Sequence, residues 1–334
     1  MLFLVTLLFM CSSFVSSRPD ALDKFMEFVT KFNKPYKNGT EEFRRRYEIF
    51  KKNLHQIEVL NKPYVEEGSA GVYGITSFSD MAQEEFKAQY LSGLRLPPHS
   101  TGKTTLLYQS EAIQGHQLRT DLPKLVDWRK SDAVSAIKDQ GRCGACWAFS
   151  AAETIESAYA IKHNTSAPSL AVQELIDCSK KNYGCKGGDI CLALNWVKGH
   201  GITYEKYYPL LDKDEDCKPI PPMADVVQIS DFSCPSYVGK EDGILNILAN
   251  HGPVAAAVDA TTWNNYVGGI IRFHCENSIN HAVEIVGYDL TGSVPYYIVR
   301  NSWGTGFGMD GYLYIKIGDN LCGIAQEVSS VTIV

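Results

Sequence analysis

Two regions of the chain differ in how their hydrophobic residues are spaced. In the first, which follows residue 18, apolar side chains recur at intervals of three and four residues, and this spacing predicts amphipathic helices. The recurring residues are Phe25, Val29, Phe32, Phe43, Tyr47, Phe50, Leu54 and Ile57. A glycine-rich turn at 68–74 precedes a shorter helical run at 83–90. Residues 91–120 show little periodicity, so we expect an extended connector there.

The second region changes from helical to strand-like patterns along its length. Helical spacing predicts helices at 146–162, 172–178 and 189–198. After about Val226 the apolar runs are β-branched or aromatic and bounded by Gly or Pro, which predicts strands within 253–260, 281–289, 296–303 and 311–317. Helices followed by strands are typical of an α+β fold, here with two lobes and a cleft between them.

The first seventeen residues form an apolar block that is too short to span a bilayer. Val15 and Ser17 stand three residues and one residue before a cut after position 17, so we expect a cleaved secretory signal peptide. The block has no Lys or Arg at its start, and an uncleaved N-terminal anchor is therefore the alternative. No other segment is long and apolar enough to cross a membrane.

Composition and charge narrow the class of partner. The chain has 334 residues, of which 45% are hydrophobic and 21% charged, as in ordinary globular proteins. Its formal net charge is -6 and it has no Lys/Arg-rich run, which argues against nucleic acid as a partner. Entry into the secretory pathway would also expose the sequons at Asn38 and Asn164 to glycosylation.

The cysteine count calls for one special sulfur. The chain has ten cysteines, and removal of the signal peptide takes one of them, Cys11, and leaves nine. In an oxidising compartment an odd number leaves one thiol free or paired with another chain. The stretch QGRCGACW, residues 140–147, holds Cys143 and Cys146. These two could form a redox or metal pair, or be one structural and one reactive sulfur.

The surroundings of Cys146 favour a reactive thiol. Cys146 begins a predicted helix, whose dipole favours the thiolate. The polar AIKDQGR before the motif is not the strand that a thioredoxin-type redox pair needs, and no second Cys or His pair stands at zinc-ligand spacing. A nucleophilic thiolate needs a base and an orienting group. His281 opens a predicted strand 135 residues after Cys146, and Asn301 ends another 155 residues after it.

These motifs resemble the papain family of cysteine proteases in their order and spacing. The matching stretches are QGRCGACW, the His-Ala-Val at His281 and the Asn-Ser-Trp-Gly at Asn301. The resemblance implies a helical lobe and a β-barrel-like lobe, and no metal or cofactor. It implies that Cys146 is the nucleophile, that His281 is its general base and acid, and that Asn301 orients the imidazole. Gln140 would supply an oxyanion-hole donor, and Trp303 would cover the His281–Asn301 hydrogen bond.

The first region resembles the inhibitory propeptide of the same family. Six positions match its ERFNIN pattern, and four match its GNFD pattern with Thr in place of Asn. They are Glu42, Arg46, Phe50, Asn53, Ile57 and Asn61, and then Gly74, Thr76, Phe78 and Asp80. With the signal peptide at 1–17, this implies an inhibitory propeptide at 18–120, whose connector runs through the cleft in reverse, and a mature protease at 121–334. An amphipathic helical hairpin with another role is the alternative.

The resemblance also implies a disulfide framework. The implied pairs are Cys143 with Cys185, Cys178 with Cys217, and Cys275 with Cys322. Cys191 and Cys234 depart from the usual family pattern. They could form a fourth bridge or remain two free thiols, and the sequence leaves both open.

The substrate cleft is expected around two adjacent glycines. Gly187 and Gly188 would let a peptide approach closely, with Gly188 pairing it as an added strand. The family's S2 pocket would be formed by Asp189, Ile190, Ile279, Ala282 and Glu327. Glu327 stands where cathepsin B carries an acid, so we hypothesise that Arg or Lys is accepted at P2 beside apolar residues. The alternative is a Glu327 side chain that points to solvent. Phe307 replaces a tryptophan common on the leaving-group side.

The sequence thus predicts a cysteine endopeptidase made as a zymogen, which cleaves peptide bonds through an acyl-enzyme thioester. Lysosomal or endosomal work is the expectation, with extracellular action as the other choice. The expected partners are protein and peptide substrates, the chain's own propeptide as inhibitor, and cystatin-type inhibitors; we expect a monomer. A catalytically idle papain-like binding or inhibitory protein is the competing class. Such proteins usually lack the nucleophile, which is present here.

Overall fold

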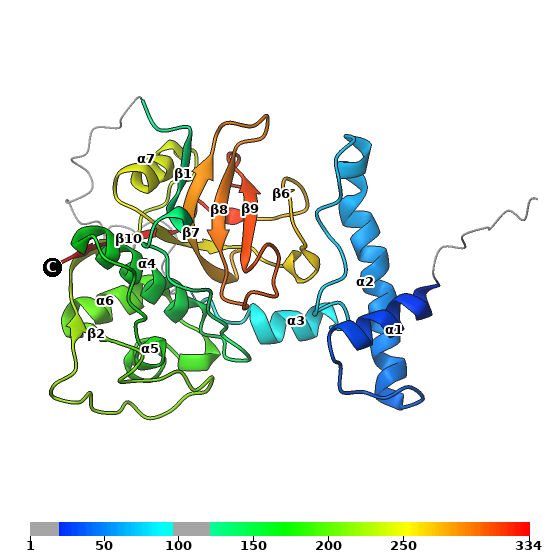
Figure 1. Ribbon diagram of the computed structural model, residues 1–334, viewed down its shortest axis with the longest axis horizontal. Helices are drawn as coiled ribbons and strands as arrows, with labels where there is room; N and C mark the ends of the chain where they lie inside the picture. The colour runs from blue at the N-terminus through cyan, green and yellow to red at the C-terminus, as the bar shows by residue number, and fades with distance from the viewer. Residues whose placement is uncertain (1–19, 96–120) are drawn as a thin grey trace, which may run out of the picture.

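The protein is built around one mixed sheet. The structure, a computed structural model, describes residues 20–95 and 121–334, so the predicted signal peptide and most of the predicted connector lie outside the described residues. The sheet has eight strands in the order β4-β10-β5-β7-β8-β9-β6, with β1 pairing β7 from outside this path (Figure 1). Its strands are β1 Leu125–Asp127, β4 Ile229–Ser233, β5 Val254–Val258, β6 Ile270–Ile271, β7 His281–Asp289, β8 Tyr296–Arg300, β9 Tyr312–Lys316 and β10 Val328–Ile333. Paired strands are antiparallel except β6 and β9.

A helical lobe lies beside this sheet (Figure 1). It contains α4 Cys146–His163, α5 Val172–Cys178 and α6 Ile190–His200, and a small sheet of β2 Ile202–Thr203 and β3 Val226–Val227. Helix α4 is buried over most of its length, because apolar or small side chains occupy most of its faces. It packs on α5 and α6 and also on β5, β7 and β10, so it joins the two lobes.

A buried ionic cluster fixes α4 against the sheet. Arg300 on β8 lies 3.1 Å from Glu284 on β7 and 3.3 Å from Glu153 on α4, and all three side chains are buried. Ser157 on α4 donates a 2.8 Å hydrogen bond to Glu284. Because β7 begins at His281 and α4 at Cys146, this cluster sets how the two elements that carry the predicted catalytic residues lie against each other.

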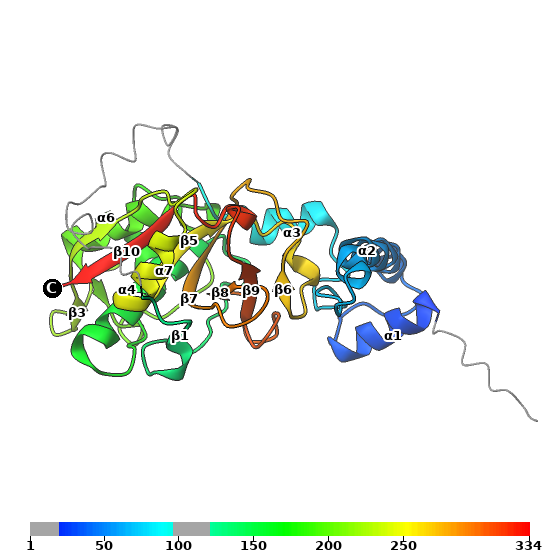
Figure 2. The same cartoon turned by 90° about the horizontal axis from the view of Figure 1, so that it is seen from above.

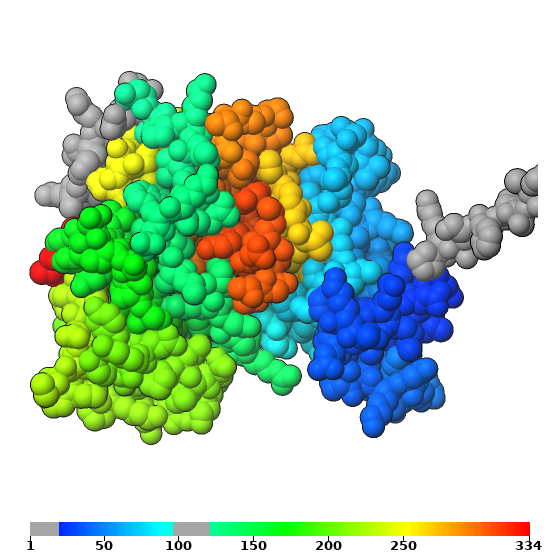
Figure 3. Space-filling model, in the orientation of Figure 1, coloured from blue at the N-terminus to red at the C-terminus, as the bar shows by residue number. Residues whose placement is uncertain are grey.

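Residues 20–95 form an N-terminal unit whose helices α1 and α2 lie at one end of the molecule (Figure 2). Its helices α1 Ala21–Lys31 and α2 Glu41–Glu66 enclose a small core of four phenylalanines, Phe25, Phe28, Phe43 and Phe50. Thr40 caps α2 by accepting a hydrogen bond from the Phe43 N–H. Helix α3 Gln83–Tyr90 runs from this pair toward residues 121–334, and the unit stands against the sheet lobe (Figures 1 and 3).

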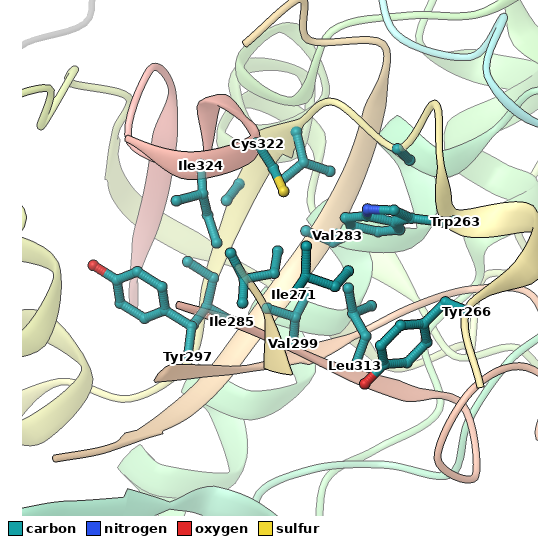
Figure 4. Packing of buried hydrophobic residues seen from close by; sticks show 14 of the residues in the cluster. Trp263, Tyr266, Ile271, Val283, Ile285, Tyr297, Val299, Leu313, Cys322 and Ile324 are labelled. Carbon is teal, nitrogen blue, oxygen red and sulfur yellow. The ribbon is translucent and has the colours of Figure 1, made fainter. Parts of the chain in front are cut away.

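The core of the sheet lobe extends into the N-terminal unit. Its centre includes Trp263, Tyr266, Ile271, Val283, Ile285, Tyr297, Val299, Leu313, Cys322 and Ile324 (Figure 4). Tyr64, Val72 and Phe86 of the N-terminal unit belong to the same buried cluster. The unit is therefore held by continuous apolar packing, which is the largest favourable contribution to such an association.

The predicted α+β fold with two lobes is confirmed, with one addition. Helices α3 and α5 have the predicted bounds, α4 runs one residue further, and α6 begins after Asp189, which caps it by accepting from the Leu192 N–H. The addition is α7 Asp242–Asn250, a helix in the half where strands were expected, which packs on β7. Its apolar residues Ile244, Leu245, Ile247 and Leu248 have helical spacing, so the signal was present.

Candidate active site

Cys146 is a free thiol at the first turn of α4. Among the described residues it is the free cysteine, and its side chain is fully buried. The backbone N–H groups of Ala282, Trp147 and Cys146 itself face the sulfur and favour its anionic form. Ala282 directly follows His281 on β7, so the sulfur lies at the junction of the two lobes.

The side chains of His281 and Asn301 are joined by a hydrogen bond. The His281 Nε2 to Asn301 Oδ1 distance is 2.8 Å, and the Ser302 N–H donates to the same oxygen at 2.9 Å. Because this oxygen accepts both bonds, Nε2 carries a proton, and a neutral His281 has its lone pair on Nδ1. Nδ1 has no hydrogen-bond partner within residues 20–95 and 121–334.

Gln140 is held rigidly at the start of the same motif. Its side chain is buried; Nε2 donates to the Cys143 carbonyl at 3.1 Å, and Oε1 accepts from the Ser302 hydroxyl at 2.7 Å. The second hydrogen on Nε2 remains for another acceptor. Sequence reasoning did not single out Ser302, which orients both Gln140 and Asn301. Its place directly after Asn301 was the available signal.

The N-terminal unit covers the sulfur with its last described residues. Gly188 N–H donates to the Gly93 carbonyl at 2.9 Å, and Arg95 N–H donates to the Gly188 carbonyl at 2.8 Å. Leu94 therefore pairs with Gly188 in the parallel sense. Gly93 approaches so closely that a Cβ built on it would lie 2.7 Å from the Cys146 sulfur. This segment occupies the place where the sequence expected a peptide to add as a strand.

Burial keeps both reactive groups uncharged in this state. It raises the pKa of the Cys146 thiol to about 12, only partly offset by the backbone N–H groups. It also lowers the pKa of His281 to about 4, with the Asn301 hydrogen bond acting the other way. A protonated thiol is a poor nucleophile and a neutral imidazole does not stabilise its thiolate, so Cys146 is unreactive while the propeptide covers it.

Trp303 packs against the imidazole of His281 with the two rings tilted. The His281 and Trp303 ring centroids are 4.8 Å apart. Three aromatic side chains of the N-terminal unit, Phe78, Phe86 and Tyr90, pack edge-on against Trp303 at 6.0, 5.4 and 5.6 Å. Phe307 also packs edge-on against Trp303, with ring centroids 5.0 Å apart, and is buried. Trp303 thus links the catalytic region to the unit that covers it.

The predicted S2 residues divide into an apolar group and an acidic pair. Ile190 and Ala282 are buried in the cluster against which Leu94 packs, and Ile279 is half-buried beside Gly323. The carboxylate oxygens of Asp189 and Glu327 lie within 4.8 Å of each other and of the Cys191 sulfur. Glu327 is partly buried, and burial is the main reason that its pKa is raised, so a side chain pointing freely to solvent does not describe it.

Four disulfides are formed in the structure. They are Cys143–Cys185, Cys178–Cys217, Cys275–Cys322 and Cys191–Cys234. The last is the pair for which the sequence left both a bridge and two free thiols open. The sulfur of Cys191 is thus bonded to Cys234, so the only group of metal-ligand type found among the described residues, Asp189, Cys191 and Glu327, has no thiolate to offer. The predicted sequon residues Asn38 and Asn164 are both exposed.

Most of the matched propeptide positions make contacts within the N-terminal unit, whereas the Gly74 N–H donates to the Asn265 carbonyl and Phe78 packs on Trp303 in the sheet lobe. Arg46 bonds the carboxylates of Glu42 and Glu85 and the Asp80 carbonyl, while Asp80 accepts from Lys34. Asn53 donates to the carbonyls of Ser79 and Met81, and Asn61 bonds the backbone of Val72 and Tyr73. These contacts shape the turn that leads into α3.

The docking contacts of this unit on the sheet lobe were not foreseen. Arg272 donates its backbone N–H to the Tyr64 hydroxyl at 2.8 Å and its guanidinium to Glu67 at 2.6 Å. Ser79 donates to the Asn265 side chain at 2.9 Å. No motif marks Arg272, because its partner is 205 residues away in sequence.

Within the described residues no helix is long and apolar enough to cross a membrane.

Comparison with known proteins agrees with this geometry. Residues 122–332 match the family described as "Papain family cysteine protease", and residues 25–86 match the "Cathepsin propeptide inhibitor domain (I29)". The motifs of the second region resemble those of cathepsin O. Human cathepsin O is 40% identical over 290 residues, covering 86% of this chain and 88% of that protein.

More distant relatives cover the chain equally well. A viral cathepsin of Epiphyas postvittana nucleopolyhedrovirus is 35% identical over 92% of this chain and 90% of its own length. The structure of a digestive procathepsin L2 proteinase from Tenebrio molitor larval midgut is 34% identical, with a TM-score of 0.82 over 94% of this chain and 100% of that one. The chain therefore belongs to the papain family of cysteine proteases and is a zymogen whose cathepsin-type inhibitory propeptide precedes the protease domain.

Proposed function

We propose that this protease is an endopeptidase in which Cys146 is the nucleophile and His281 the general base and acid. Asn301 orients the imidazole, and Gln140 is an oxyanion donor. The observation that carries this assignment is the Nε2 to Oδ1 hydrogen bond of 2.8 Å, which leaves Nδ1 of His281 as the ring nitrogen that can accept a proton. The free thiol of Cys146, at the same junction of the lobes, is the proton source.

The chemical steps follow from these positions. Once the propeptide leaves, the Cys146 thiol passes its proton to Nδ1 of His281, and the thiolate attacks the carbonyl carbon of the scissile bond. The Gln140 amide and the Cys146 N–H stabilise the oxyanion, each contributing about 3 kcal/mol in comparable sites. His281 then protonates the leaving amine, and a thioester remains on Cys146. Water, deprotonated by His281, hydrolyses this thioester and restores the thiol.

The domain boundaries and location belong to the same proposal. A signal peptide at 1–17 would be removed first, and cleavage near Asp121 would separate the propeptide at 18–120 from the mature protease at 121–334. The four disulfides and the exposed sequons support passage through an oxidising secretory pathway. We assign the work to an acidic lysosome or endosome, with extracellular action as the other destination. We further propose a monomer that cystatin-type inhibitors block.

The S2 pocket would accept basic as well as apolar side chains at P2. Leu94 pairs with Gly188 in the zymogen and packs on the buried cluster to which Ile190 and Ala282 belong. Glu327 supplies a carboxylate on the other side, where an incoming guanidinium or ammonium group would pair with it. A pocket with both kinds of wall supports both kinds of P2 residue.

The catalytic assignment is tested by activation of the purified zymogen. At acid pH with a thiol reductant we expect the chain to shorten to a form that begins near residue 121 and to react at Cys146 with an epoxide or fluoromethyl-ketone probe. Cys146→Ala should neither react nor process itself, while remaining cleavable by added wild-type enzyme. A wild-type chain that neither shortens nor reacts would favour the idle, papain-like binding protein.

The P2 assignment needs a separate comparison. Hydrolysis of Phe-Arg and Arg-Arg reporter substrates by the activated enzyme gives a ratio of kcat/KM values that reports P2 choice alone, because P1 is Arg in both. Glu327→Ala should lower the Arg-Arg rate about tenfold relative to Phe-Arg, the usual size for one charge-assisted contact. An unchanged ratio would show that Glu327 does not contact P2.

A further inference from the structure

The disulfide Cys191–Cys234 differs from the other three in what it joins. Cys191 is the second residue of α6 in the helical lobe, and Cys234 directly follows β4, a strand of the main sheet. Cys143–Cys185 and Cys178–Cys217 stay within the helical lobe, and Cys275–Cys322 stays within the sheet lobe. Cys191–Cys234 therefore ties helix α6 to the end of a strand of the main sheet, and both cysteines pack in the buried cluster of the helical lobe.

Each end of this bond lies next to one acid of the S2 pocket. On the helical side, Asp189 caps α6 two residues before Cys191, and its own N–H donates to Asn182 at 2.8 Å. On the sheet side, the N–H of Val328, which follows Glu327, donates to the carbonyl of Pro235 at 3.1 Å, one residue beyond Cys234. The two acids are thus connected through the disulfide by short and well-bonded segments.

The sulfur atoms themselves touch the acidic region. The Cys191 sulfur lies 3.6 Å from the Glu327 carboxylate and 3.6 Å from the Ser329 hydroxyl. Ser329, in turn, donates to the Cys234 sulfur at 3.4 Å. The carbonyl of Glu327 accepts from the Ala257 N–H at 3.0 Å, which fixes its backbone against β5. The Glu327 side chain therefore packs against the disulfide.

Among residues 20–95 and 121–334, neither Asp189 nor Glu327 forms an ion pair with a basic side chain. Burial, and then the proximity of Asp189, raises the pKa of Glu327; burial also raises the pKa of Asp189. Within the described residues no basic side chain contributes to either shift. Two enclosed carboxyl groups within 4.8 Å repel one another when both ionise, so without a tether they would move apart. A cationic side chain of the substrate would complete the arrangement.

We propose that Cys191–Cys234 is a specificity-determining element that holds Asp189 and Glu327 together as a two-carboxyl receptor for a basic P2 side chain. The disulfide acts by position: it fixes the distance between Asp189, which caps α6, and Glu327, which precedes β10. Asp189 is the second carboxyl of the receptor. This inference rests on the proposed role of Glu327 at P2.

The test measures the Arg-Arg to Phe-Arg ratio of kcat/KM in activated variants, with each preparation normalised by titration of Cys146. Cys191→Ala/Cys234→Ala should lower the ratio about tenfold, mainly through KM for Arg-Arg. Cys178→Ala/Cys217→Ala removes a disulfide of similar loop length away from the pocket, with separations of 39 and 43 residues, and should leave the ratio unchanged. Asp189→Asn keeps both the disulfide and the cap of α6, and should also lower the ratio.

The outcomes separate the two proposals. If Glu327→Ala lowers the ratio while the Cys191/Cys234 and Asp189 variants leave it unchanged, the inference is overturned and the role of Glu327 stands. If Glu327→Ala itself leaves the ratio unchanged, both are overturned. If both disulfide variants lower the ratio equally, the effect is general loosening and the specific role of Cys191–Cys234 is rejected. Should the alanine pair fail to fold, Cys191→Val/Cys234→Ala refills the lost volume, and the same ratio decides.

Discussion

The substitution Gly93→Ala should make Cys146 of the intact zymogen react faster with a small thiol reagent. The backbone of Gly93 has an ordinary φ angle, so alanine is compatible with its conformation. Its Cβ, however, would lie 2.7 Å from the Cys146 sulfur and 2.9 Å from the Gly144 carbonyl oxygen. Gly144 cannot retreat, because its N–H is bonded to the Cys185 carbonyl at 3.0 Å and Cys185 is tied to Cys143. The propeptide segment must therefore lift.

The size of the effect follows from the cost of overpacking. Inserting a methyl group into a well-packed contact costs about 1–3 kcal/mol, and 1.4 kcal/mol is a factor of ten in an equilibrium constant. Lifting also strains the Gly188 N–H to Gly93 carbonyl bond of 2.9 Å. If Cys146 reacts only when this segment opens, Gly93→Ala should speed alkylation of the intact zymogen about 5- to 150-fold.

The assay is the rate of iodoacetamide labelling of Cys146 at neutral pH, with intact mass used to count only unprocessed chains. Gly199→Ala is the matched control, since this exposed glycine on α6 has open space around its Cβ position. Its labelling rate should equal that of the wild type. If Gly93→Ala is labelled no faster than Gly199→Ala, the close seating of Gly93 on the sulfur is not what protects it.

Three further predictions concern charge. The Arg46 guanidinium lowers the pKa of Glu85, so this ion pair stabilises the fold at pH values above the ordinary pKa of Glu, and the stabilisation is lost as the pH falls through the lowered pKa. Arg46→Gln should therefore lower the melting temperature of the zymogen most near neutral pH. An equal decrease at acid pH would contradict this. Arg300→Met leaves Glu284 buried without its partner and should cost about 3–5 kcal/mol by chemical denaturation, against a negligible change if the pair is dispensable. Because burial raises the pKa of Cys146 to about 12, the ultraviolet absorbance of its thiolate, measured against Cys146→Ala, should appear only after the propeptide is removed. A thiolate signal in the intact zymogen near neutral pH would show that Cys146 is not held as an uncharged thiol.

Local pattern was sufficient for much of this protein. Helix α4 begins at Cys146 and β7 at His281, as the spacing of apolar residues and the turn residues before each element indicated. Such a periodicity arises because one face of a helix or strand is buried, and it is visible in the sequence because every residue of the element contributes to it. The same local signal is present in α7, although strands lie on both sides of it in the sequence.

The order of the reactive residues was also readable from the sequence alone. Cys146, His281 and Asn301 stand at element ends, where a rigid scaffold presents polar side chains to a cleft. Their residue types restrict the chemistry, since a thiol, an imidazole and an amide together suit acyl transfer. The sequence therefore determined the two lobes, the cleft and the candidate nucleophile.

Only the tertiary structure decided how distant segments meet. The pairing of Cys191 with Cys234 spans 43 residues, and Gly93 reaches Cys146 from a different domain. The uncharged state of Cys146 and His281 likewise depends on what covers them. Such contacts leave no periodic trace, because each depends on one pair of residues brought together by the packing of the whole chain. The sequence determined which groups could react, and the fold decided that in the zymogen they do not.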